Sequence, residues 1–384
     1  MNQWKKCLFV GTMATLTLGA FSACGQQGDA SEEAQQMVTL WAGGSDNVKV
    51  GMEQIVKAFN ASEKGEEYKL KLEFIMSGSG SQSLSDRIIA AKKAGESNTD
   101  YDLILVSDAE VGVYLQEGGE DIFVPYEETQ IPNVQTKVSS GEGVLVPYRG
   151  TTVVLAYNSE NVSSVSETAA ELYQWIEDNP GRFAYNTPGS GGAGSSFVQT
   201  VLYNELPEEA LTSSDAKWKA EWSKGFERLK SLHSSMYQTG GQTIYPNKNQ
   251  GTLDLLINQE VDMIPAWADM VITNLANGTL PENIKMTQVE PGFTGNVDGL
   301  AIPSIGSNID GAQAVMDFML TTQAQQILLD TMAAIPVIDS SLISSDNSIY
   351  LKDLKIDSFR TSSLGTLANE LNEEWDQTIG TMGQ

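Results

Sequence analysis

An α/β fold, with helices covering β-sheets, is predicted by two patterns in this sequence. From Val38 onward, short apolar runs of strand length alternate with stretches whose apolar residues recur at helical spacing. The run Tyr101–Ser107 is almost continuously apolar, which is typical of a parallel strand buried on both faces. Strands that alternate with amphipathic helices indicate sheets covered by helices.

The first part of the chain supplies three strands and two helices. We expect strands at Val38–Trp41, at Leu70–Phe74, where apolar residues alternate, and at Tyr101–Ser107. Helices are predicted through Val48–Phe59 and, after a Ser/Gly loop at Ser77–Ser83, through the apolar positions Leu84, Ile88 and Ile89.

A crossing to a second lobe is expected at Val144–Asn158, which contains two apolar strands interrupted by Pro147–Gly150. A return crossing is expected near Pro291–Gly299, and the last fifty residues are weakly patterned. The remaining predicted elements are a helix near Thr168–Asp178, a strand at Arg182–Tyr185, a helix opening at Ser195, a strand at Asp262–Ala266 followed by a helix, an apolar run at Leu300–Pro303, and helices at Gly311–Leu320 and Gln323–Thr331.

The N-terminus has the pattern of a secretory signal peptide. Lys5 and Lys6 precede the apolar run Leu8–Phe21, which is shorter than the roughly 20 residues that span a bilayer. The ending Phe21-Ser22-Ala23-Cys24 resembles the lipobox of bacterial lipoproteins and implies cleavage before Cys24 and acylation of that cysteine. Ordinary secretion, with Cys24 incidental, is the alternative.

Composition excludes several classes of partner and site. The formal net charge of −27 repels nucleic acid and anionic lipid headgroups. The cysteines are Cys7, which is lost with the signal, and Cys24, so the mature chain has no intramolecular disulfide and no His/Cys metal cluster. The single histidine, His233, continues an apolar helical stripe, which favours packing over catalysis.

Two glycine-rich loops are candidate ligand sites. The loop Ser77–Ser83 lies between a strand and a helix, a place that suits an anion or a hydroxyl-rich ligand, unless it is a flexible loop whose serine caps the helix. The loop Gly189–Gly194 matches G-x-G-x-x-G, but the strand before it is short and no second strand ends in an acid, which argues against a dinucleotide. The same loop suits a phosphate- or hydroxyl-binding rim.

Aromatic and acidic residues at predicted strand ends form a third candidate. Trp41 ends the first strand, and Trp267 with Asp269 follows the strand through Ile264. Ligands of open α/β sheets bind at the carboxyl ends of strands, and an indole beside a carboxylate suits a cation or an amine. Core packing is the alternative for each tryptophan.

Four segments together resemble the extracellular solute-binding proteins of bacterial ABC importers, in the type II group that includes binding proteins for iron, thiamine, polyamines and phosphonates. The resemblance covers Val38 to Pro336. The segments are VPYRGTTVVLAYNSENV (146–162), GRFAYNTPGSGGAGSSFVQTVLY (181–203), GTLDLLINQEVDMIPAW (251–267) and GNVDGLAIPSIGSNIDGAQAVMDFMLTTQAQQILL (295–329).

The resemblance implies an α/β, two-lobe type II periplasmic-binding-protein fold with a ligand cleft between the lobes. The implied division is a signal peptide at 1–23, a tether at 24–37, one lobe at 38–147 plus 299–335, the other at 148–298, and a C-terminal extension at 336–384 packing on the lobes. Carried over by position, the ligand contacts would be Trp41, Ser79, Ser81, Ser107, Asp108, Tyr148, Arg149, Ser190, Gly194, Ser195, Trp267 and Asp269.

The function implied is that of a monomeric, lipid-anchored receptor outside the cytoplasm. It would capture a small polar solute, zwitterionic or bearing an amine or a phosphoryl group, and deliver it to an ABC permease and its ATPase, without cofactor, metal or catalysis. The chain has no Tyr-Tyr pair, which argues against iron, and Arg149 could bind a carboxylate or phosphonate or brace the hinge. The alternatives are a carbohydrate-active enzyme with sugar-stacking tryptophans and a surface scaffold lipoprotein.

Overall fold

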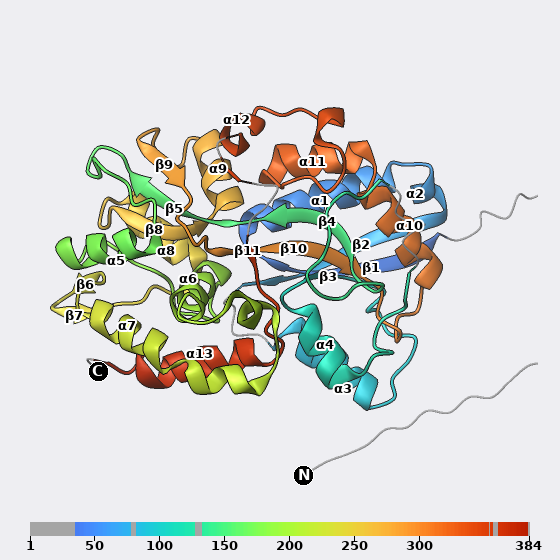
Figure 1. Cartoon of the computed structure of the whole chain (residues 1–384). Helices are drawn as coiled ribbons and strands as arrows, with labels where there is room; N and C mark the ends of the chain where they lie inside the picture. Colours follow the sequence, from blue (N-terminus) through green and yellow to red (C-terminus); the bar gives the residue numbers. More distant parts are fainter. Residues whose placement is uncertain (1–34, 78–81, 127–132, 353, 356–359, 383–384) are drawn as a thin grey trace, which may run out of the picture. The chain divides into compact units, whose positions relative to one another are not determined.

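Two β-sheets and the helices around them make up the part of the chain that the computed structural model describes, residues 35–77, 82–126, 133–352, 354–355 and 360–382 (Figure 1). The predicted signal peptide, its cleavage site at Cys24, and Ser79 and Ser81 lie outside these residues. Within the described residues, no helix combines the length and the apolar character needed to cross a membrane.

The first sheet has six strands in the order β11-β10-β3-β1-β2, with β4 also paired to β10. Strand β1 is parallel to both β2 and β3, whereas β10 is antiparallel to β3 and β4. The strands are β1 (Gln36–Gly44), β2 (Tyr68–Met76), β3 (Leu103–Ser107), β4 (Val146–Thr151), β10 (Thr294–Ala301) and β11 (Arg360–Thr361).

Helices cover both faces of this sheet because its strands are apolar on both sides. One core joins β1 and β2 to α1, α10 and α11, and another joins β3 to α3 and α4. Figure 1 shows α1 and α11 above the sheet and α3 and α4 below it. The helices are α1 (Asp46–Asn60), α2 (Lys64–Glu67), α3 (Leu84–Lys93), α4 (Val111–Gly118), α10 (Ile309–Met319) and α11 (Thr322–Met332).

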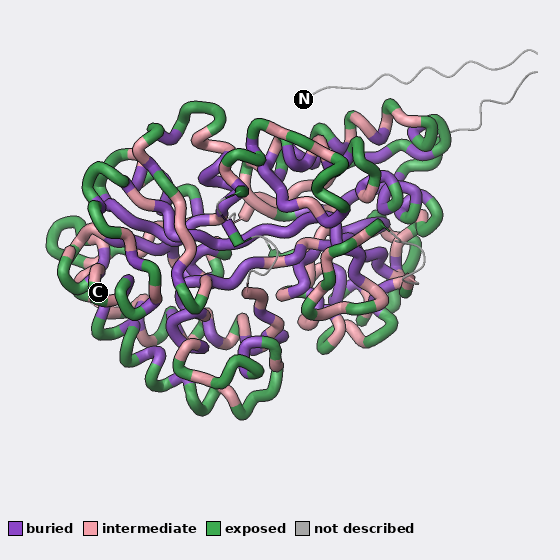
Figure 2. Tube along the Cα trace, turned by 45° about the horizontal axis from the view of Figure 1, so that its top comes forward, coloured by how far each residue is buried: buried purple, intermediate pink, exposed green. Residues whose placement is uncertain are grey.

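The second sheet is antiparallel, with β5 (Val153–Asn158) between β8 (Met263–Trp267) and β9 (Ile284–Thr287). Buried residues follow its strands, and exposed residues gather on the outer helices (Figure 2). Around it lie α5 (Ala169–Asp178), α6 (Gly192–Tyr203), α7 (Ser223–His233), α8 (Lys248–Ile257), α9 (Ala268–Ala276), the hairpin β6 (Gln238–Thr239) and β7 (Gln242–Thr243), and the 3-10 helices Glu208–Thr212 and Ala216–Glu221.

The predicted strands and helices of both parts are confirmed, with three corrections. The crossing Val144–Asn158 breaks at Thr152, and Pro147–Gly150 lie inside β4. Among the named strands β4 pairs with β10, with a register shift at Asp298/Gly299, and on its other side only Gly150 forms an isolated bridge, with Ile335. In the described structure Pro147 thus faces no second strand, so its missing N–H is tolerated.

The other two corrections concern the region before and within α6. Arg182–Tyr185 is not a regular strand, because Phe183 forms only isolated bridges, with Met236 and Met263. Helix α6 begins at Gly192, three residues before the predicted Ser195. Two side-chain acceptors support the early start, since Oδ1 of Asn249 accepts from the N–H of Ala193 and Oδ1 of Asn186 accepts from the N–H of Gly194.

The C-terminal segment packs against both sheets after leaving α11. Strand β11 is parallel to β10, and Trp375 of α13 lies in the second-sheet core, 1% exposed. This segment contains a 3-10 turn at Ser340–Leu342, α12 (Ser348–Leu351), β11 and α13 (Leu367–Thr378). The lobe boundaries given above stay predictions.

Candidate ligand-binding cleft

A cleft of about 970 Å³ opens where the carboxyl ends of β1, β2 and β3 face the N-terminal ends of α6 and α9. Gly44, Met76 and Ser107 line it from these three strand ends, and Gly192 of α6 and Trp267 at the end of β8 line it from the other side. Parallel strands end at the same edge of a sheet, which is where ligands of open α/β sheets bind.

The side chains that line the cleft carry an excess of negative charge. The lining carboxylates are Asp86, Glu110, Asp269 and Asp298, and Arg149 is the lining cation among the described residues. Four negative charges and one positive charge leave −3.

Arg149 is held between two carboxylates from different elements. Its Nη1 lies 3.0 Å from Oδ2 of Asp269, and its Nε and Nη2 donate to Oδ2 of Asp298 at 2.7 and 2.6 Å. Burial acts to lower the pKa of Arg149, but Asp298, Tyr148 and Asp269 outweigh it, so the pKa is raised and the side chain stays charged. The positive charge of the guanidinium is therefore balanced by two carboxylates of the protein itself.

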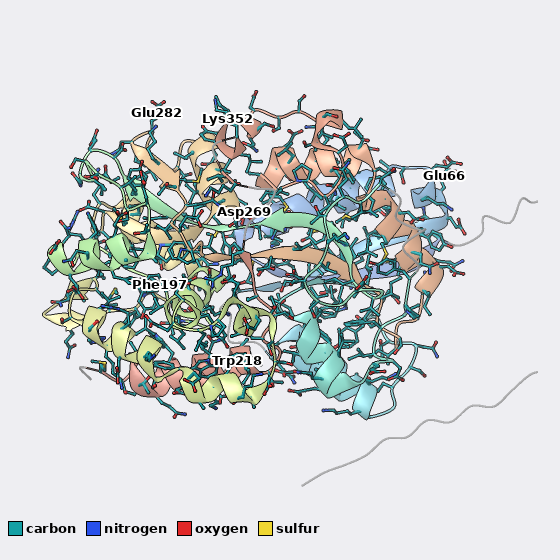
Figure 3. All side chains as sticks on the ribbon, viewed as in Figure 1. Glu66, Phe197, Trp218, Asp269, Glu282 and Lys352 are labelled. Atoms are coloured by element: carbon teal, nitrogen blue, oxygen red, sulfur yellow. The ribbon has the colours of Figure 1, made fainter. Side chains whose placement is uncertain are left out.

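Asp269 joins three elements through one carboxylate. Its Oδ2 accepts from Arg149 and, at 2.9 Å, from Nδ2 of Asn47 in α1, while its Oδ1 accepts from Oγ1 of Thr151 in β4 at 3.2 Å. Figure 3 labels Asp269 among the side chains near β4 and β10. Because every bond runs to protein, Asp269 acts first as a brace between the two sheets.

Glu110 and Asp298 keep acceptor capacity toward the cleft. Glu110 accepts from the hydroxyl of Ser107 at 3.2 Å, and both Arg149 contacts to Asp298 reach Oδ2, which leaves its Oδ1 without a described partner. Burial between the cleft walls, followed by the charge of Asp298, raises the pKa of Glu110, although its side chain is open to the cleft. A ligand cation would relieve this repulsion.

Backbone N–H groups of the glycine loop and of the first turn of α6, which an anion would need as donors, already donate to acceptors within the protein. The N–H of Ala193 donates to Oδ1 of Asn249 at 3.1 Å, and that of Gly194 donates to Oδ1 of Asn186 at 2.9 Å. The N–H of Gly189 donates to Oγ of Ser195 at 3.0 Å. First-turn N–H groups attract phosphate only while they are free, so this end is poorly suited to a phosphate.

Trp267 lies against the first turn of α6. A Cβ built on Gly192 would come 2.6 Å from Cζ2 of the indole, so the glycine lets the helix pack directly on the ring. Trp267 lines the cleft and is partly buried. Only a residue without a side chain permits this approach.

We expect Gly192→Ala to lower the free energy of unfolding by about 1–3 kcal/mol, because the added methyl group must displace the indole. Urea denaturation would measure the change. Gly251→Ala in α8 is the matched control, since its Cβ would meet Pro246 at an ordinary 3.4 Å, and it should leave the stability unchanged or slightly raised. Equal losses in both variants would contradict the prediction.

Six of the residues predicted to contact ligand line the cleft, and four do not. Trp41 packs against the core formed by β3, α3 and α4, and its indole N–H donates to the carbonyl of Asp100. Asp108 is fully buried and accepts from Ser139 and Val297. Tyr148 lies in the first-sheet core, and Gly194 faces Asn186. The six that line the cleft are Ser107, Arg149, Ser190, Ser195, Trp267 and Asp269.

Sequence reasoning missed Glu110, Asp298 and two asparagines of α13, Asn369 and Asn372, which also line the cleft. Glu110 follows the predicted third strand by three residues, so the rule that ligands bind at the carboxyl ends of strands could have identified it. The local sequence pattern of α13 does not indicate that this helix lies beside the cleft.

His233 lies outside the residues that line the cleft. Its Nδ1 lies 2.9 Å from the hydroxyl of Tyr245, and burial lowers its pKa. Over the described ranges, no cluster of three His, Cys, Asp or Glu side chains has the arrangement of a metal site.

Comparison with solved structures shows the fold. A periplasmic thiamin-binding protein has a TM-score of 0.68 at 14% identity, covering 90% of this chain and 97% of that chain. A GABA receptor (Atu4243) has a TM-score of 0.68 at 13% identity, covering 90% and 99%. These likenesses show the two-lobe periplasmic-binding-protein fold, with the cleft between the lobes.

Sequence comparison shows the family. Protein YnjB of Escherichia coli (strain K12) is 23% identical over 208 residues, 52% of each chain, so the chain matches about half the length of that relative. Residues 54–349, more than half of the chain, match the model of the bacterial extracellular solute-binding proteins. This family consists of binding proteins that act outside the cytoplasm. The chain therefore belongs to the bacterial extracellular solute-binding protein family.

Proposed function

We propose that this protein captures a small organic cation, such as an amine, in the cleft between its lobes and delivers it to an ABC importer. The observation that carries the proposal is the net charge of −3 on the cleft lining, where Glu110 and Asp86 have no cationic partner in the lining. Carboxylates without a cationic partner attract a ligand that supplies the missing positive charge.

The same geometry disfavours an anionic solute. Arg149, the cation that a carboxylate or phosphonate would need, is already paired with Asp269 and Asp298. The N–H groups of Ala193 and Gly194 at the start of α6 are bonded to asparagine side chains. An anion would have to break these contacts and approach Glu110 at a cost in repulsion.

An aromatic ring adds a second attraction for cations. Trp267 lines the same cleft as Glu110 and Asp298, and an indole face attracts a cation by about 0.5–2 kcal/mol. Thiamin and GABA, named for two structural relatives, both carry a positively charged nitrogen. These relatives support the class of ligand and do not name it.

The receptor would work as a trap anchored at the membrane surface. Acylation at Cys24 would hold the protein outside the cytoplasm, and ligand that touches both lobes would shift the population toward the closed form that a permease recognises. The ATPase of the importer would supply the energy. The receptor itself performs no chemistry in this proposal.

Thermal unfolding of residues 25–384 against a panel of solutes tests the proposal. We expect thiamine, spermidine or choline to raise the midpoint, since a ligand at about a hundred times its Kd stabilises a fold by roughly 2.7 kcal/mol. Phosphate, citrate and fructose 6-phosphate serve as the anionic controls. Stabilisation by anions or neutral sugars alone would contradict a cation receptor, and recovery of an altered compound would indicate an enzyme.

A further inference from the structure

The C-terminal segment beyond the family match forms part of the cleft wall. The match ends at residue 349, whereas Ser362, Ala368, Asn369 and Asn372 line the cleft. Three of these residues lie in or at the start of α13, which Figure 1 shows beneath α6 and α7. The residues that meet a ligand are therefore not confined to the part of the chain that family membership describes.

Helix α13 is anchored firmly to the second sheet. The indole N–H of Trp375 donates to the hydroxyl of Tyr185 at 3.1 Å, and its ring meets that of Tyr245 edge-on at 4.8 Å between centroids. Leu367 and Leu371 are buried in the same core. A helix fixed by a buried stripe holds its cleft-facing residues in place.

The segment also reaches the first sheet and its helices. Ser362 donates to Oε1 of Gln199 at 3.0 Å, directly after β11 pairs with β10. The backbone N–H of Thr366 donates to Oε1 of Gln116 in α4 at 3.1 Å. Helix α13 is thus tied to both sides of the cleft, in a place where it faces any ligand held between them.

The chemistry of this wall differs from that of the acidic part. Asn369 and Asn372 carry neutral amides, which both donate and accept hydrogen bonds, whereas Glu110 and Asp298 only accept when ionised. Neutral amides do not attract a charge strongly, but they distinguish a ligand with N–H or O–H groups from one without them. The two parts of the cleft would therefore recognise different features of one ligand.

We propose that α13 is a specificity-determining wall, in which Asn369 and Asn372 select cations that carry additional hydrogen-bonding groups. This inference rests on the proposed capture of a cation. It predicts that loss of both amides changes the ranking of cations rather than abolishing the attraction for positive charge, which comes from the carboxylates.

Isothermal titration of the full mature chain with spermidine, thiamine and tetramethylammonium tests this wall. In the double variant Asn369→Leu/Asn372→Leu we expect binding of spermidine and thiamine to weaken about tenfold, as loss of a hydrogen bond to a charged or polar ligand predicts. Tetramethylammonium, which has charge but no donor or acceptor, should keep its Kd within about twofold. Gln377→Leu, an amide-to-leucine change on the exposed side of α13, is the matched control and should leave every Kd unchanged.

Asn372→Asp keeps an acceptor oxygen and the size of the side chain, and it should bind spermidine at least as tightly as the wild type, even if the double variant folds poorly. Unchanged Kd values in a folded double variant would refute the role of α13 in specificity, and so would an equal weakening for tetramethylammonium. Neither result would contradict the proposal that the protein binds cations. Failure of the wild type to bind any of the three cations would refute the proposed function, and this inference with it.

Discussion

Replacing Arg149 with methionine is expected to lower the free energy of unfolding by about 3–5 kcal/mol, because removal of one partner leaves buried carboxylates uncompensated. The side chains of Arg149 and Asp269 are 7% and 6% exposed, and that of Asp298 is 15% exposed. Two like charges would then face each other in the centre of the fold. Guanidinium chloride denaturation at neutral pH, analysed by linear extrapolation, measures the loss.

Arg182→Met is the matched control for this prediction. Arg182 also donates twice to one carboxylate, at 2.6 and 2.7 Å to Asp262, but its side chain is 37% exposed. The side chain of Asp262 is 9% exposed, but it keeps the hydrogen bond from Nδ2 of Asn161 at 2.7 Å, and water can take the place of the half-exposed arginine. We therefore expect a smaller loss than at Arg149, about 1–2 kcal/mol. A loss at Arg149 no larger than at Arg182 would show that the central network does not brace the lobes.

Glu110→Gln is expected to weaken binding of a cation about tenfold or more, because a charge-assisted hydrogen bond is replaced by a neutral one. The same change should raise the stability of the ligand-free protein at neutral pH. Burial between the cleft walls disfavours the ionised carboxylate, and Asp298 repels it. If Glu110 binds a cation as proposed, its ionised carboxylate serves binding at a cost in the stability of the ligand-free protein.

The pH dependence follows from the direction of the pKa shift of Glu110. A raised pKa in the folded state means that folding favours the protonated acid, so its stabilising effect is complete below the unfolded pKa and is lost as pH rises through the raised value. Cation binding changes in the opposite sense and tightens over the same interval, because the ligand needs the carboxylate ionised. This interval lies above the ordinary range of glutamate.

Titration with spermidine at a series of pH values would check this dependence. In the wild type, affinity should fall as pH is lowered into that interval, and Glu110→Gln should flatten the profile. Tyr114 in α4 stays protonated over this interval, because burial raises its pKa, so it does not contribute to the profile. Glu117→Gln, an exposed change in α4, the helix that directly follows Glu110, should keep the wild-type profile. A flattened profile in both variants would show that Glu110 is not the group responsible.

The local residue pattern predicted most of the helices and strands of the fold. The capping box at Thr168 and Glu171 starts α5 where the spacing predicted it, and the apolar run at Tyr101–Ser107 contains the buried strand β3. Such signals are local because a helix or strand buries one face according to its own period. At Pro147 the proline predicted an interruption between two strands, but pairing with β10 keeps this residue inside β4.

The candidate site could be predicted only where it depends on strand ends. Ser107, Trp267 and Asp269 follow predicted strands, and all three line the cleft. The sequence does not show that Arg149 pairs with Asp269 and Asp298, because 120 and 149 residues separate them along the chain. The sequence is therefore equally compatible with an anionic ligand and with an amine.

The sequence by itself determined the α/β class, the order of the elements and the resemblance to solute-binding proteins, since periodicity and motif order are properties of the chain. Only the tertiary structure decided the electrostatic sign of the cleft and the place of α13 beside it. Charge in a site depends on which side chains neutralise one another, and a helix joins a cleft through packing of its buried face, as Trp375 does against Tyr185. Both depend on contacts between residues that are distant in sequence.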